Sequence, residues 1–419
     1  MSSKQNLRVS ITDVTEEDLL NAVKDENGVL YSRDWKKLLK FKNEFCQVYS
    51  IKKGTENICK YAFKSCKSLV KIVIPTSINN IGSSAFRYCI NLSSIVIPNS
   101  VTELSPWVFA DCYNLENIFI PNTVVNIKSS AFYNCINLKQ IDIPNFTTNI
   151  GQYAFFNCES IKSINIPNSV VSIGRFAFAG CKSLEKIIIP DSLTCIGDGI
   201  LKNCTNLESV VIGNSVTRIG VDSFRECINL KNIAIPNSVI DIEFGAFRYC
   251  KNLESIVIGN SVTEIGRWAF HECTSLESIV IGNSVTEIGS GAFWNCTSLE
   301  SIVIPDSVTE IGERAFARCT SLESIVIGNS VTEIGGWAFA RCTSLESIVI
   351  GNSVTEIGSS AFSMCKNLES VVIPDSVTKI GKDAFYNCEN LSRIVIPKGS
   401  IENFKEVISV EYWEKLCEE

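Results

Sequence analysis

The chain repeats itself every 23 residues, and this periodicity limits its fold more than any other feature. An Ala-Phe pair marks most units, with its phenylalanine at Phe63 and then at every 23rd position to Phe385; Leu201 takes one of the fifteen places. No insertion or deletion interrupts the series. A unit this short cannot bury its own apolar face, so identical units must stack. The sequence therefore predicts a one-dimensional solenoid with a column of stacked phenylalanines.

The unit from Leu253 to Ser275 shows how one coil is expected to fold. Leu253, Ile256 and Ile258 alternate with other residues at the period of a short strand. A turn at Gly259 ends the strand, and other units carry Pro there. Gly266 is expected to allow a second bend, and the segment from Ala269 to Cys273 to form a short helix. This predicts an α/β repeat with a curved parallel β-sheet on the concave side and short helices or 3-10 turns on the convex side.

Cysteine follows the same repeat. Fifteen of the nineteen cysteines recur every 23 residues, from Cys66 to Cys388. Cysteine metal sites usually contain close pairs such as CxxC, which are missing here. Single, evenly spaced cysteines are typical of small buried residues. We expect free thiols, no metal site and no cofactor.

The unit reads L-x-x-I-x-I-P-x-S-V-x-x-I-G-x-x-A-F-x-x-C, with Gly often in place of Pro. This pattern resembles the Treponema-type leucine-rich repeat of BspA-like proteins. The resemblance implies a leucine-rich-repeat solenoid over residues 46–399, an N-terminal helix and hairpin cap in residues 1–45, and a C-terminal helical cap in residues 400–419. It also implies an adhesin or surface interaction protein that contacts host or neighbouring-cell macromolecules.

Both ends of a solenoid need covering, because they would otherwise expose the core. Thr15 and Asp18 predict the start of a helix over residues 16–23, with Leu19, Leu20 and Val23 on its covering face. A hairpin is expected over residues 28–39. At the other end, an apolar helix face is predicted from Phe404, Val407, Tyr412, Trp413 and Leu416.

Three columns of side chains are candidates for contact with a partner. Strand alternation places a valine of each central unit on the open face, beside a column of serine. So long a valine stripe favours an interaction surface, although β-branched residues also simply favour strands. Tryptophans beside the Ala-Phe pair are either binding anchors or side chains folded back onto neighbouring units. The candidate partner-binding residues are Val257, Val280, Val303, Val326, Val349, Val372, Ser278, Ser301, Ser324, Trp268, Trp294 and Trp337.

Catalysis is not expected. The single histidine, His271, occupies a repeat position that should face solvent, and no nucleophile, base and acid form a constellation around it. No phosphate-binding loop is present. Two columns of glutamate, one before and one after each strand, are read as a solvated acidic edge, with calcium between them as the weaker alternative. No catalytic, cofactor-binding or metal-binding residue is therefore predicted.

Charge and hydropathy restrict the partner. The net charge of −7 and the pI near 5.2 argue against nucleic acid, and no apolar run is long enough to span a membrane. A protein or glycoprotein partner and a monomeric chain are expected. The resemblance implies a cell-surface or secreted location. The alternative is an intracellular scaffold in the cytoplasm if the chain is the full precursor, because no secretory signal is visible and unpaired cysteines favour a reducing compartment.

Overall fold

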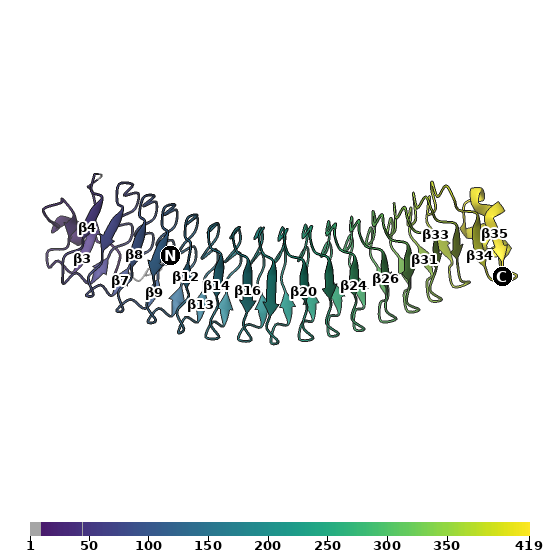
Figure 1. The fold of residues 1–419 in the computed structure, drawn as a ribbon, viewed down its shortest axis with the longest axis horizontal. Coiled ribbons are helices and arrows are strands. Elements are labelled where there is room, and N and C mark those ends of the chain that lie inside the picture. Colours follow the sequence, from purple (N-terminus) through teal and green to yellow (C-terminus); the bar gives the residue numbers. More distant parts are fainter. Residues whose placement is uncertain (1–9, 44) are drawn as a thin grey trace, which may run out of the picture. The chain divides into compact units, whose positions relative to one another are not determined.

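The computed structural model describes residues 10–43 and 45–419. The chain divides into two compact units, residues 1–192 and 193–419. Each unit is a parallel β-solenoid, in which coils of one repeat follow one another and contribute strands to parallel ladders (Figure 1). The predicted leucine-rich-repeat solenoid is confirmed.

Each coil carries two short strands rather than the single strand predicted. In the coil that starts at Leu253, β22 (Ser255–Val257) pairs with β24 (Ser278–Val280) of the next coil, with Ser255 opposite Ser278. The second strand, β23 (Glu264–Ile265), pairs with β25 (Glu287–Ile288). In each ladder a residue pairs with the residue 23 positions later, so equivalent residues of successive coils lie side by side.

In residues 1–192 the first ladder type comprises β4 (Val48–Ser50), β6 (Lys71–Val73), β8 (Ser94–Val96), β10 (Asn117–Phe119), β12 (Ile141–Asp142), β14 (Ser163–Asn165) and β16 (Lys186–Ile189). The second comprises β5 (Asn57–Ile58), β7 (Asn80–Ile81), β9 (Glu103–Leu104), β11 (Asn126–Ile127), β13 (Asn149–Ile150) and β15 (Ser172–Ile173).

In residues 193–419 the first ladder type comprises, besides β22 and β24, β18 (Ser209–Ile212), β20 (Asn232–Ala234), β26 (Ser301–Val303), β28 (Ser324–Val326), β30 (Ser347–Val349), β32 (Ser370–Val372) and β34 (Arg393–Ile396). The second comprises, besides β23 and β25, β17 (Cys195–Ile196), β19 (Arg218–Ile219), β21 (Asp241–Ile242), β27 (Glu310–Ile311), β29 (Glu333–Ile334), β31 (Glu356–Ile357) and β33 (Lys379–Ile380).

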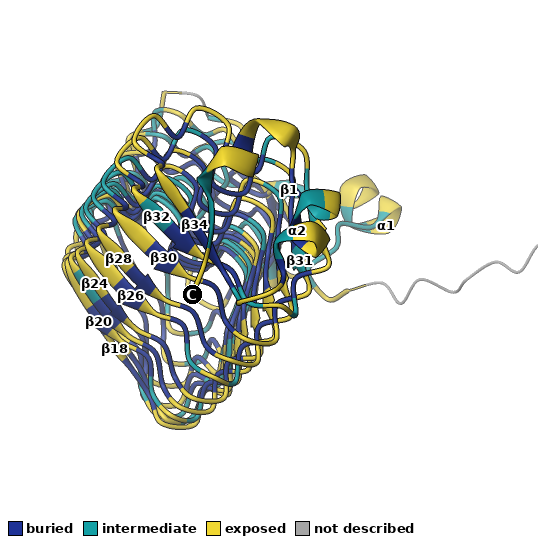
Figure 2. Ribbon diagram, turned by 90° about the vertical axis from the view of Figure 1, so that its right-hand side faces the viewer, coloured by how far each residue is buried: buried dark blue, intermediate teal, exposed yellow. Residues whose placement is uncertain are grey.

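The core runs along the inside of the coils, where Figure 2 shows the buried residues. In residues 1–192 the marker phenylalanines from Phe63 to Phe178 stack with ring centroids 5.0–5.6 Å apart. A second stack with the same spacing runs from Phe224 to Phe385. Leu201, at the exceptional position, is fully buried. The predicted aromatic column is thus present in both units.

The segment predicted as a short helix is a run of turns. The Ala269 amide donates to Gly266 within the coil, but the Phe270 amide donates to the Ala292 carbonyl of the next coil, at 2.8 Å. An α-helix would need these amides for bonds to the residue four positions earlier. The same geometry holds Trp268 in the left-handed region, at φ 59°. The helix predicted for this segment is therefore absent, and bonds to the residue three positions earlier, such as that of Ala269, agree with the alternative of 3-10 turns.

Gly266 has a different role from the bend that we predicted. Its φ lies outside the left-handed region, and a Cβ on it would lie 2.5 Å from the carbonyl oxygen of Ile242 in the preceding coil. Glycine is needed here because two backbones approach closely.

The N-terminal helix is shorter than predicted and covers nothing. α1 (Glu16–Leu20) begins with the predicted capping box of Thr15 and Asp18 but ends three residues early. Leu19 and Leu20 are exposed, so the predicted covering face is wrong. The hairpin covers the first coil instead: β1 (Val23–Lys24), β2 (Leu30–Tyr31) and β3 (Lys37–Lys40) form an antiparallel meander, and β3 pairs parallel with β5.

The C-terminal segment is only partly helical. It comprises α2 (Ile401–Val407), the 3-10 helix η1 (Val410–Lys415) and β35 (Leu416–Glu418), which extends the last ladder by pairing parallel with β34. Phe404 and Tyr412 are buried, and the Tyr412 ring meets Phe385 edge-on at 5.8 Å. Of the other residues predicted for the apolar face, Trp413 is exposed, and Leu416 lies in a strand rather than in a helix. Within residues 10–43 and 45–419 no helix is long and apolar enough to cross a membrane.

Candidate interaction surfaces

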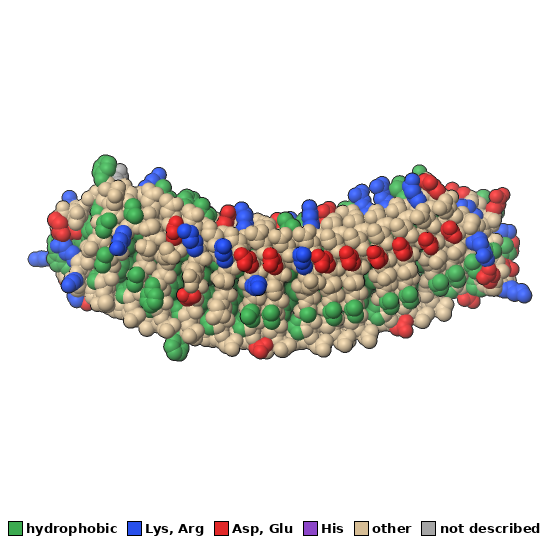
Figure 3. All heavy atoms as spheres, in the orientation of Figure 1, with side chains coloured by type: hydrophobic (Ala, Val, Ile, Leu, Met, Phe, Trp, Pro, Cys, Tyr) green, Lys and Arg blue, Asp and Glu red, His purple; other side chains and the backbone are tan. Residues whose placement is uncertain are grey.

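Six valines form an exposed stripe along the first ladder of the second unit. Between buried apolar residues, these valines are 38–63% exposed, as strand alternation predicted. The register pairs Val257 with Val280, and it aligns the valines from Val303 to Val372 in the same way. Figure 3 shows the corresponding row of hydrophobic side chains. We call this surface the valine face; it consists of Val257, Val280, Val303, Val326, Val349 and Val372.

Polar groups border the valine face on one side. Ser278, Ser301 and Ser324 are exposed and begin the same strands, two residues before the valines. The residue before each of them is an exposed glutamate, and Figure 3 shows a row of acidic side chains beside the hydrophobic row. The arrangement offers a flat apolar strip with hydroxyl groups and negative charge along its edge.

The tryptophans lie on another part of the coil. Trp268 follows β23 in the turn segment, whereas Val257 lies on β22. Trp268 and Trp294 are half-buried and meet each other edge-on, with ring centroids 6.0 Å apart. These two side chains fold against neighbouring coils, which is the alternative to their being binding anchors. Trp337 is 39% exposed, with the Arg314 guanidinium 4.7 Å from its ring.

His271 does not face solvent, so that prediction is wrong. It is 3% exposed and lies 4.8 Å from the Trp294 ring and 5.3 Å from the Tyr249 ring. Burial lowers its pKa to about 4, with a further contribution from the positive charge of Arg248. The sequence did not indicate this burial, because the equivalent position varies from lysine and arginine to alanine, serine and aromatic residues in other coils.

The cysteines are free and, in the repeat series, almost all inaccessible. Every one from Cys89 to Cys388 at the repeat position is buried. Their thiols donate to the backbone of an earlier coil, as Cys273 does to the Phe247 carbonyl at 3.3 Å. Burial raises the pKa of most of these thiols, that of Cys250 to about 12, whereas the hydrogen bond with the Cys365 thiol lowers the pKa of Cys388. They are structural donors rather than nucleophiles; the off-series Cys195 is exposed.

Potential metal ligands do not cluster in the described residues, 10–43 and 45–419. No group of three or more His, Cys, Asp and Glu side chains there could hold a metal ion. The glutamates of the second ladder lie opposite one another, Glu310 beside Glu333. At the end of this column Glu356 forms an ion pair with Lys379 at 2.6 Å.

Comparison with known proteins identifies the repeat. A family model described as a BspA type leucine rich repeat region of six copies matches residues 40–162, 148–277, 217–345 and 286–408. No curated protein matches the sequence.

Several solved structures are similar. A leucine-rich repeat protein from Bacteroides ovatus is 30% identical, with a TM-score of 0.70 over 95% of this chain and 97% of that one. A leucine rich cell surface protein from Faecalibacterium prausnitzii is 26% identical over 92% and 97%, with a TM-score of 0.44. A leucine-rich repeat protein from Eubacterium ventriosum is 22% identical over 76% and 90%, with a TM-score of 0.48.

Proposed function

This chain belongs to the BspA-type leucine-rich repeat family, and we propose on that premise that it is a non-enzymatic protein-binding module whose contact surface is the valine face. Leucine-rich repeat proteins generally serve in protein interaction, and solenoids offer extended surfaces for it. The matching family model is that of a repeat, not of an enzyme.

The observation that carries the proposal is the valine face itself. Six in-register valines leave apolar surface open to water over a length of roughly 24 Å, at about 4.8 Å per coil. Exposed contiguous apolar surface of this kind is typical of interaction sites. Because these valines are already about half buried, covering one of them stabilises a complex by about 1 kcal/mol, so several must be covered together for specific binding. The tryptophans are secondary candidates, of which Trp337 is the most exposed.

The partner that fits this surface is a protein or glycoprotein with a flat apolar strip. Glutamates beside the valine face favour basic residues at the edge of the partner, because complementary charge speeds and orients association. We propose that the chain acts as an adhesin or surface interaction protein that contacts host or neighbouring-cell macromolecules.

A capture experiment tests the proposed contact surface. The purified chain and its Val303→Lys/Val326→Lys variant are used as bait for extracellular-matrix proteins and for lysate of the native cells, with bound proteins quantified by mass spectrometry. We expect a partner retained by the wild type and reduced at least tenfold by the variant. Thr309→Lys/Thr332→Lys is the matched control, because these exposed threonines precede the second strands β27 and β29 and do not belong to the valine face. Equal retention by all three baits would refute the valine face as the contact surface.

An intracellular scaffold is the second candidate. It is favoured by the free cysteines, including the exposed Cys195, since such thiols persist best in a reducing compartment. Protease shaving of intact native cells, followed by mass spectrometry, separates the two. Peptides of this chain released from intact cells support the adhesin; peptides found only after lysis support the scaffold.

A further inference from the structure

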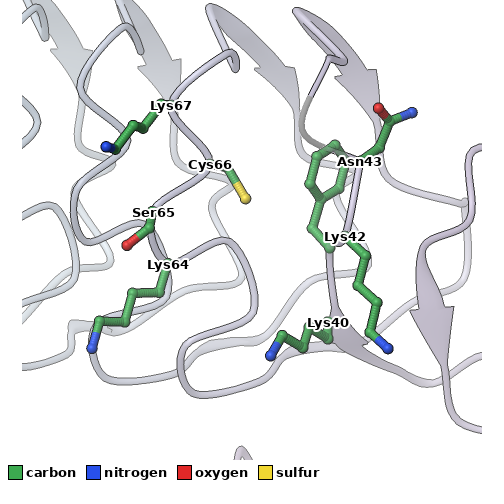
Figure 4. Close-up of a pocket in the computed structure, with 8 residues that line it drawn as sticks. Lys40, Lys42, Asn43, Lys64, Ser65, Cys66 and Lys67 are labelled. Atoms are coloured by element: carbon green, nitrogen blue, oxygen red, sulfur yellow. The ribbon is translucent and has the colours of Figure 1, made fainter.

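A hollow lined by lysine lies where the N-terminal hairpin meets the first coils. Its volume is about 580 Å³. Figure 4 shows Lys40, Lys42 and Asn43 on one wall, and the turn from Lys64 to Lys67 on the wall facing it. We call this the basic hollow; its lining is completed by Phe41, Ser65 and Cys66.

The hollow follows from the way the solenoid begins. The turn at residues 64–67 is the first of the Ala-Phe-x-x-Cys turns, and the hairpin before it has no equivalent turn to pack against it. The consequence is visible at the repeat cysteines, because Cys66 is only half-buried whereas Cys89 and its successors are buried. The floor is packed on the core: Phe41 is buried, and its ring centroid lies 5.0 Å from that of Phe63.

Positive charge is concentrated around the basic hollow, although the chain as a whole is acidic. Residues 33–72 contain eleven Lys and Arg but three Asp and Glu, while the whole chain has a net charge of −7. Nearby lysines have partners: Lys36 pairs with Glu56, and Lys52 lies 3.4 Å from Glu26. Lys40, Lys42 and Lys67 are exposed, and no carboxylate of residues 10–43 and 45–419 lies within ion-pair distance of their ammonium groups or that of Lys64.

We propose that the basic hollow binds an anionic ligand that carries two or more phosphate or sulfate ester groups. Ammonium groups on flexible stems suit tetrahedral oxyanions, which do not need the planar fork of arginine. The volume lies in the range of small-molecule sites and exceeds what one inorganic anion would fill. This site is separate from the valine face and does not depend on the protein-binding function.

Calorimetric titration of the full chain tests the site and the source of the anion. The probes are inositol hexakisphosphate and a heparin-derived sulfated tetrasaccharide, with inositol and the desulfated tetrasaccharide as neutral counterparts. We expect one charged probe to bind and its neutral counterpart not to bind, with affinity falling as salt is raised from 50 to 500 mM. Preference for the inositol probe points to a phosphate ester, and preference for the tetrasaccharide points to a sulfated glycan.

Variants locate the binding. Lys42→Ala/Lys64→Ala should weaken it at least tenfold, while Lys42→Arg/Lys64→Arg, which keeps the charge, should retain most of it. Two controls should bind like the wild type: Lys162→Ala/Lys251→Ala, and Arg318→Ala/Arg341→Ala in a smaller basic hollow of about 390 Å³. Binding of neither charged probe, or equal loss in the controls, overturns the proposal.

Discussion

Within one coil, the environment of a residue depends on whether its backbone amide donates its hydrogen bond within the same coil or to the next coil. The Phe270 amide bonds across to Ala292, and this fixes the ring in the stack, while Trp268 takes a left-handed conformation. Burial of Phe270 and Cys273 could be predicted from their recurrence alone. The burial of His271 could not, because it results from contact with aromatic rings of adjacent coils, Tyr249 and Trp294.

The buried histidine predicts a specific pH response. The pKa of His271 is about 4 in the folded chain and 6.5 in its ordinary state, so the unfolded chain binds the proton first. Its contribution to stability is complete above pH 6.5 and is lost as the pH falls toward 4. We expect His271→Gln to reduce the loss of unfolding free energy between pH 7 and pH 4 by up to about 3 kcal/mol. Urea unfolding at several pH values measures it, and parallel curves for both proteins would contradict it.

The thiols predict a selective labelling pattern. Burial raises the pKa of most repeat cysteines, for example that of Cys250, whereas Cys195 is exposed. Iodoacetamide at pH 8 should label Cys195 first, the half-buried Cys46, Cys66 and Cys417 more slowly, and the buried series only after unfolding. Peptide mass spectrometry over time checks this order. Rapid labelling of Cys250 in the native chain would show that the coils are not packed as described.

At the scale of the element, each coil consists of a longer strand, a two-residue strand and a series of turns. The longer strand, such as β22, could be predicted because three residues already show alternation. The short strand β23 could not, since alternation cannot be recognised in two residues. The spacing of Ala269 and Cys273 suggested a helix, but turns that bond to the next coil produce the same spacing.

Adjacent glycines offer a matched test of how closely the coils approach. A Cβ on Gly335 would lie 2.6 Å from the Glu313 amide nitrogen, whereas the nearest atom to a Cβ on Gly336 is the Ser359 carbonyl oxygen at 3.3 Å. Gly335→Ala should therefore lower the free energy of unfolding by about 1–3 kcal/mol, and Gly336→Ala by much less. Chemical denaturation of both variants measures the difference. Equal effects would mean that glycine at this position is not required by backbone contact.

At the scale of the whole chain, the columns of exposed side chains could be predicted from the repeat, whereas the structures at the two ends could not. The valine face was predicted residue by residue, because strand alternation and a constant period together determine which side chains are exposed. The basic hollow was missed, since its walls come from the hairpin and from the first turn, and no repeat relates Lys42 to Lys64. The C-terminal strand was also missed, because β35 lies beyond the last repeat.

Removal of residues 401–419 should make the chain aggregate. The truncation takes away α2, η1 and β35, which leaves the edge of β34 unpaired and the Phe385 ring without Tyr412. Unpaired edges and exposed core recruit other chains. Size-exclusion chromatography with light scattering measures the outcome. The full-length Trp413→Ala variant is the control, because Trp413 is partly exposed and its loss leaves β35 in place. A soluble monomeric truncation would refute the capping role.

The central claim is that partners bind along the valine face. Hydrogen exchange with mass spectrometry, on the chain alone and with a protein captured by it, tests this claim most directly. We predict slower exchange in the peptides of β22 to β32, which carry Val257 to Val372, and unchanged exchange in the turns that carry Trp268 and Trp337. Protection confined to those turns or to residues 40–67, with the valine strands unchanged, would contradict the account.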